Sequence, residues 1–175
     1  MTKVIFIFFW AVAMFRYGSF KAHLPVSYRV QNAMLSLFLV FSASFGMDSL
    51  ITAVFHPSII QKYFYIQSGI FPPLATLVIA MLVSYASCIE LFIGFNMAQQ
   101  KCQGRILALR FIPLLVAVTA LDVARIISVR SASEPNRSKL IFEAFLVVWM
   151  TAVFYVLLYR FCKSKQAKEL MTNVT

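Results

Sequence analysis

Four long apolar runs dominate the sequence and restrict what it can fold into. They are Ala33–Phe55, Pro72–Phe95, Ile106–Val129 and Leu140–Phe161. A helix needs about 20 mostly apolar residues to cross a hydrocarbon layer about 30 Å thick, and each run is that long. Backbone that faces lipid must be helical or closed into a barrel, and these continuous runs lack the alternation of barrel strands. The sequence therefore predicts an all-α, up-and-down bundle of four transmembrane helices.

The composition leaves no part of the chain for a soluble domain. Of the 175 residues, 61% are hydrophobic and 13% are charged, whereas about a quarter of a typical soluble domain is charged. We therefore expect residues 1–175 to form a single membrane bundle. The net charge of +10 comes from short Lys and Arg clusters between the apolar runs. Because no basic stripe or recognition motif accompanies that charge, we expect no nucleic-acid partner.

The N-terminal segment 4–20 has an apolar run that is short for a span. The run Val4–Phe15 follows a lysine, as the core of a signal peptide follows its charged start. Arg16 comes directly after it, without a clear small-x-small cleavage site, so we expect an uncleaved hydrophobic segment. The segment is either interfacial or re-entrant, or it forms a fifth helix with residues 16–20, and the sequence does not choose between these.

Basic residues are distributed unequally between the two ends of the expected bundle. One end has nine of them: Arg16, Lys21, Arg29, Lys101, Arg105, Arg160, Lys163, Lys165 and Lys168. The other end has four: Lys62, Arg130, Arg137 and Lys139. Cytoplasmic loops carry an excess of Lys and Arg, so we expect the first end, with the C-terminus, to be cytoplasmic.

Motifs for enzymatic chemistry are missing from the sequence. His23 and His56 lie at or outside the ends of the spans, so they do not supply a pair of haem ligands within the bundle. The sequence has no Cys-x-x-Cys, phosphate-binding glycine loop, nucleophile elbow or zinc motif. We therefore expect no catalytic residues, no metal site and no cofactor.

Two of the three cysteines fall at the expected cytoplasmic edge of the membrane. Cys102 and Cys162 each neighbour a lysine, a position that suits reversible palmitoylation. Two unmodified thiols are the alternative, and the sequence leaves both open. Cys88 lies inside a span, where we expect it to act as a small apolar residue.

Charged residues within the spans are the candidate functional residues. A charge in hydrocarbon is costly, so it faces the bundle interior, a partner or an aqueous cavity. Antiparallel tracing puts four of them at similar depth in the non-cytoplasmic half, where we expect an intramembrane polar cluster: Asp48, Asp122, Arg125 and Glu143. A second buried acid, Glu90, lies in the cytoplasmic half of the second span.

Two interpretations of the polar cluster are open. In the structural one, Arg125 pairs with Asp122, which shares its helix face, or with Asp48, and the pair fixes helix register. In the functional one, the excess carboxylates bind a cation or relay protons. We prefer the structural interpretation because a bundle of this size has little room for a substrate path. Glu143 is also close enough to the interface to be solvated.

Small residues and prolines predict local features of the helices. Ser42 with Gly46, and Ala80 with Ser84, form small-xxx-small pairs that permit close helix contact. Pro113 is expected to kink the third span or to reshape its first turns.

The segment Cys88–Leu109 resembles the small four-helix DoxX-like membrane proteins. The resemblance is carried by Glu90-Leu91-x-x-Gly94 followed by Arg105, and it covers about a quarter of the chain. It implies a small redox-linked membrane protein. Four-helix adaptors of animal membranes share the same general layout.

These observations lead to two functional hypotheses. The first is a non-enzymatic accessory, scaffold or trafficking and assembly factor that packs, within the lipid bilayer, against another membrane protein or against itself. The alternative is a small redox-linked (DoxX-like) or proton- or ion-coupled membrane protein that uses the intramembrane acids.

Overall fold

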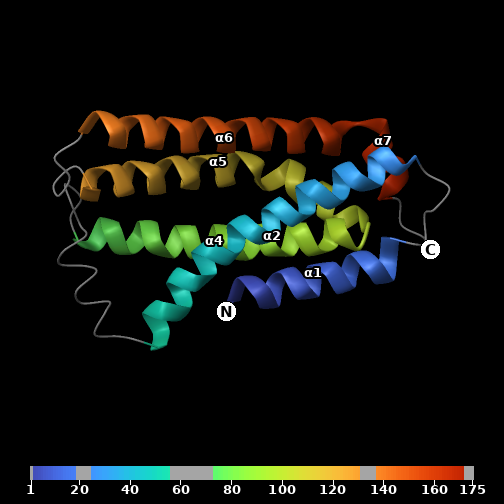
Figure 1. Ribbon diagram of the computed structural model, residues 1–175, viewed down its shortest axis with the longest axis horizontal. Coiled ribbons are helices and arrows are strands. Elements are labelled where there is room, and N and C mark those ends of the chain that lie inside the picture. The colour runs from blue at the N-terminus through green and yellow to red at the C-terminus, as the bar shows by residue number, and fades with distance from the viewer. Residues whose placement is uncertain (1, 19–24, 56–72, 131–136, 172–175) are drawn as a thin grey trace.

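The protein is almost entirely helical in the parts of the chain that its structure, a computed structural model, describes (Figure 1). These parts are residues 2–18, 25–55, 73–130 and 137–171, with some side chains near the helix ends left out. The helices are α1 (Thr2–Gly18), α2 (Val26–Phe55), α4 (Pro73–Ala98), α5 (Cys102–Arg130), α6 (Arg137–Lys163) and α7 (Lys165–Leu170). No strand occurs among these residues, so the expected all-α bundle is confirmed.

Within the described parts of the chain, four helices are long and apolar enough to cross a membrane, so the chain is an integral membrane protein. Their candidate spans are Val26–Met47, Val78–Ala98, Cys102–Arg125 and Ile141–Lys163. Each overlaps one of the apolar runs of the sequence. The α2 helix begins well before its apolar run, because polar residues there are accommodated at the end of the bundle. Asn32, for example, is fully buried and its Nδ2 donates a hydrogen bond of 2.8 Å to the Met97 carbonyl oxygen of α4.

The helices α2, α4, α5 and α6 run alternately up and down (Figure 1). As a result, the start of α2, the turn between α4 and α5, and the end of α6 with α7 all lie at the same end of the molecule. We call this the basic end, because it carries most of the lysines and arginines of the described chain: Arg16, Arg29, Lys101, Arg105, Arg160, Lys163, Lys165 and Lys168.

The α1 helix packs along the side of the bundle against α2 and α4. Its Trp10 Nε1 donates a hydrogen bond of 2.9 Å to Ser36 Oγ on α2. Near its start, the Lys3 ammonium lies 3.7 Å from the centre of the Phe45 ring, also on α2. The N-terminal segment, for which the sequence allowed several arrangements, is therefore helical. It has 17 residues, fewer than the roughly 20 that a span needs.

Glycine allows α2 and α4 to approach each other closely. A Cβ atom at Gly94 would lie 2.8 Å from Val40 Cγ2 and 3.1 Å from the Ser36 carbonyl oxygen. A Cβ atom at Gly46 would instead meet the Ser87 hydroxyl. Small residues at a helix crossing let backbones come together, which increases packing between helices in a membrane. Gly46, from the expected Ser42–Gly46 pair, therefore lies at the contact between α2 and α4.

The turn between α4 and α5 is a tight helix end. Gln100 has a positive φ of 56°, its N–H donates to the Met97 carbonyl, and the Lys101 N–H donates to the Asn96 carbonyl. This is the hydrogen-bond pattern of a Schellman motif, which satisfies the last carbonyl groups of a helix. Farther along, α5 continues through Pro113. Its first turns run at an angle to the rest of the helix, as expected for a proline kink (Figure 1).

Candidate functional site

The centre of the bundle holds a carboxyl group, that of Glu90. The α4 helix buries this residue on the same face as Ala86, Ile93 and Met97, which recur at helical spacing and belong to the core. The Glu90 side chain is only 6% exposed. A polar group buried at this depth requires hydrogen-bond partners from the protein, because lipid supplies none.

Tyr155 on α6 is the partner that the structure provides. Its hydroxyl donates a hydrogen bond to Glu90 Oε1, and the residue is 3% exposed. The adjacent Phe154 ring holds this part of α6 against the bundle, because it stacks on Phe38 of α2 with ring centres 4.0 Å apart. The Tyr155–Glu90 contact thus joins two helices that are 65 residues apart in the chain.

The other two spans also contribute to this site. The Ser42 side chain of α2 contacts the Glu90 carboxyl, and the Thr119 side chain of α5 contacts the Tyr155 hydroxyl. We call Ser42, Glu90, Thr119 and Tyr155 the central polar network. Because each of the four spans supplies one member, the network can fix the relative register of all four helices. A carboxyl and a phenol in contact can also exchange a proton.

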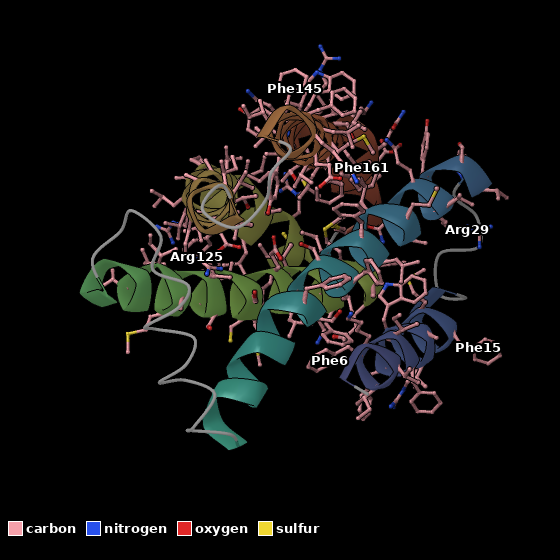
Figure 2. All side chains as sticks on the ribbon, turned by 60° about the vertical axis from the view of Figure 1, so that its left-hand side comes forward. Phe6, Phe15, Arg29, Arg125, Phe145 and Phe161 are labelled. Carbon is pink, nitrogen blue, oxygen red and sulfur yellow. The ribbon has the colours of Figure 1, made fainter. Side chains whose placement is uncertain are left out.

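The expected polar cluster includes a close ion pair within α5. Arg125 Nη2 and Nε donate to Asp122 Oδ1 at 2.7 and 2.9 Å, and the two residues are three positions apart. The Arg125 side chain is 13% exposed and that of Asp122 is 25% exposed. Arg125 lies on the side of α5 that faces α4 (Figure 2). The charges therefore partly neutralise each other inside the membrane region.

The described contacts place Glu143 in a different ion pair. Its Oε1 lies 4.0 Å from Lys139 Nζ, one turn away on α6, and its side chain is 48% exposed. That Glu143 is solvated near the interface stays a prediction. Asp48 belongs to α2, but its side chain lies outside the described residues. The described ion pairs thus join Asp122 to Arg125 and Glu143 to Lys139.

The two candidate palmitoylation sites differ in accessibility. The Cys162 side chain is fully buried in the core, whereas that of Cys102 is partly exposed at the start of α5. Arg105 Nη1 also lies 3.5 Å from the Cys162 carbonyl oxygen, which ties this part of α6 to α5. An acyltransferase needs access to a thiol, so only Cys102 is suitably placed in this structure.

Sequence reasoning identified Glu90 as a buried acid but did not find its partner. A tyrosine in a span is unremarkable by itself, and Tyr155 was not among the candidates. The sequence does contain a signal for this pairing, which is the similar depth of the two residues in the membrane. Each lies about two helical turns before the last residue of its span, at Ala98 and Lys163. Because both spans end at the basic end, the two side chains are at similar depth.

Among the described residues, no group of three or more His, Cys, Asp or Glu side chains could hold a metal ion.

Comparison with known proteins adds no relative to this description. No protein-family model, curated protein or solved structure matches the chain.

Proposed function

We propose that the chain is a non-enzymatic, multi-pass accessory or assembly protein that packs against another membrane protein. The observation that carries this proposal is the unpacked first half of α6. In the most apolar stretch of α6, only 11% of the residues are buried inside the bundle. The corresponding share in α2 is 39%. A span whose side chains are so little buried by its own bundle leaves a large apolar surface for another helix.

The exposed surface of α6 extends around the helix rather than along one stripe. Consecutive large side chains are 41–66% exposed: Ile141, Phe142, Phe145, Leu146, Val147, Val148, Trp149 and Met150. Figure 2 shows Phe145 pointing away from the other helices, whereas Phe161 at the far end of α6 points inward. The helix joins the core only from Phe154 onward. We call residues 141–150 the free half of α6.

Van der Waals packing is the main source of helix association in a membrane, because lipid tails are as apolar as the side chains. Bulky, rigid side chains such as Phe145 and Trp149 can supply that packing at a helix–helix contact. A partner that covers the free half of α6 would bury apolar side chains that the bundle itself leaves exposed. This is the basis for preferring a protein partner over a purely lipid-facing role.

Site-specific photo-cross-linking tests this proposal directly. A benzophenone side chain placed at Phe145 or Trp149 should form a cross-link to another protein in native membranes. The matched control is Phe92 on α4, which is similarly exposed at 55% but lies on a well-packed helix. A protein adduct at Phe145 and Trp149 with only lipid adducts at Phe92 supports the proposal. Lipid adducts alone at all three positions would rule it out.

The proposal includes an orientation with the basic end and the C-terminus in the cytoplasm. It is supported by the excess of Lys and Arg at that end. In a background without the native cysteines, Lys101→Cys and Lys165→Cys should resist an impermeant thiol reagent in intact cells. Lys62→Cys, between α2 and α4 in the sequence, should react readily. The reverse labelling pattern would overturn the orientation.

A second candidate function is supported by the central polar network. Glu90 and Tyr155 form a hydrogen-bonded acid–phenol pair inside a membrane bundle, and intramembrane acids commonly belong to proton or ion paths. In this case Glu90→Gln should fold normally but abolish proton uptake into proteoliposomes, measured with an entrapped pH-sensitive dye. If the wild-type protein takes up no protons under an imposed potential, the central polar network has a structural role only.

A further inference from the structure

A groove lies between α1 and α4 on the side of the bundle. Its volume is about 400 Å³, which is within the range of sites for small-molecule ligands. Most of its wall is apolar and consists of Phe6, Phe9, Val12 and Ala13 of α1 together with Phe95 of α4. Two polar residues complete the lining: Arg16 of α1 and Gln99, directly after α4. The groove therefore has the composition of a site for a molecule with a long apolar part and a polar part.

The polar residues lie together at one end of the groove. Phe6, Phe9, Ala13 and Arg16 follow each other at helical spacing along one face of α1. Both α1 and α4 run toward the basic end (Figure 1), so Arg16 and Gln99 are at the membrane edge and Phe6 is deeper. The ring of Phe6 lies between α1 and the bundle, whereas Phe15 points outward (Figure 2).

We propose that this groove binds an anionic phospholipid. Its acyl chain lies along Phe6, Phe9 and Phe95, and its phosphate lies at Arg16 and Gln99. A guanidinium binds a phosphate through paired, charge-assisted hydrogen bonds, and an amide group supplies further donors. Along the bilayer normal, the apolar wall lies deeper and the cationic rim lies at the membrane edge. The acyl chain and the headgroup of a lipid have the same order.

The shape of the groove favours a lipid over a transmembrane helix. A helix with its side chains is about 10–12 Å across, whereas a single acyl chain is much thinner and can lie between aromatic rings. The space of about 400 Å³ is lined by three phenylalanine rings, with Ala13 as the only small side chain in its lining. The positive charge of Arg16 at the rim also matches a phosphate.

Native mass spectrometry of the full chain in detergent tests the proposal. Phosphatidylglycerol should remain bound to the wild-type protein after the detergent is removed, and phosphatidylcholine should be retained less. Arg16→Gln should weaken phosphatidylglycerol retention about fivefold, the effect of one basic residue near an anionic lipid. Arg160→Gln is the matched control, because Arg160 is exposed at the basic end but does not line the groove.

A second pair of variants tests the apolar part of the groove. Val12→Trp fills the groove and should abolish retention of both lipids, whereas Phe15→Trp, at a residue that is 90% exposed outside the groove, should not. Circular dichroism and size-exclusion chromatography show that each variant has folded. Equal retention of the two lipids by the wild type, or unchanged retention in Arg16→Gln, would overturn the proposal. A protein cross-link from a benzophenone at Phe9 would show a partner helix in place of the lipid.

Discussion

The Tyr155 hydroxyl donates a hydrogen bond to the Glu90 carboxyl, and this contact joins α6 to α4 inside the bundle. Ser42 and Thr119 add contacts from α2 and α5. Among the described residues of α6, the buried side chains begin at Phe154, so the burial of α6 in the core depends on residues from Phe154 onward. The stability of the protein should therefore be sensitive to this network.

The variant Tyr155→Phe should lower the free energy of unfolding by about 1–3 kcal/mol, because it leaves the Glu90 carboxyl buried without its donor. This exceeds the roughly 0.6 kcal/mol that an average hydrogen bond between membrane helices contributes. Glu90→Gln should have a smaller effect, because the amide oxygen can still accept the bond. Thermal unfolding in a mild detergent measures both variants.

The double variant Glu90→Leu with Tyr155→Phe provides the control for that comparison. With no buried polar group left unpaired, it should recover much of the stability that Tyr155→Phe loses. If Tyr155→Phe unfolds at the wild-type temperature, the hydrogen bond does not hold α6 to α4.

The ion pair between Asp122 and Arg125 predicts unequal effects of its two residues. Arg125→Leu should lower the free energy of unfolding by about 1–3 kcal/mol, because it leaves Asp122 without its cation. Asp122→Asn should cost less, because Asp122 is the more exposed partner and an amide can still accept a bond from Arg125. Replacing Arg125 by Leu together with Asp122 by Ala should recover stability, since no unpaired charge remains.

Glu143→Gln is the matched control for these variants. Its pair with Lys139 is exposed, and exposed ion pairs contribute little, so its effect should stay within about 0.5 kcal/mol. An Arg125→Leu protein as stable as the wild type in detergent would show that the Asp122–Arg125 pair does not support the bundle.

The close contact between α2 and α4 predicts a difference between two glycines. Gly94→Ala should destabilise the bundle by about 1–3 kcal/mol, because the new methyl group meets a backbone carbonyl, that of Ser36, which cannot move aside. Gly46→Ala should cost less, because its three nearest atoms all belong to side chains: the Ser87 hydroxyl, which can rotate, the Ser87 Cβ at 3.0 Å and Val83 Cγ1 at 3.6 Å. Thermal unfolding of the two variants tests this ranking. If Gly94→Ala is as stable as Gly46→Ala, the helices can separate at position 94 without loss of stability.

Any acylation of the chain is expected at Cys102 and not at Cys162. Cys102 is partly exposed at the membrane edge of the basic end, whereas the Cys162 thiol is enclosed in the core. Acyl-biotin exchange should therefore lose its signal in Cys102→Ser and keep it in Cys162→Ser. A signal that survives Cys102→Ser would contradict this assignment.

The fold class was predictable because it depends on local properties of the sequence. The length and apolarity of the four runs require helices in a bilayer, whatever their neighbours are. The position of Pro113 and the spacing of Asp122 and Arg125 are equally local, and the structure describes both within a single helix. Glu90 stood out for the same reason, as an acid in an apolar run.

Only the tertiary structure decided which residues from different helices meet. Apolar residues occur around the whole circumference of a transmembrane helix, so its sequence does not reveal the face that packs inward. The pairing of Glu90 with Tyr155, the contact of Gly94 with Ser36 and the exposure of the first half of α6 all depend on helix rotation. The sequence by itself determined a bundle of membrane helices, because crossing a bilayer is a property of each helix. The central polar network depends on the rotation and tilt of all four spans, which packing between the helices decides.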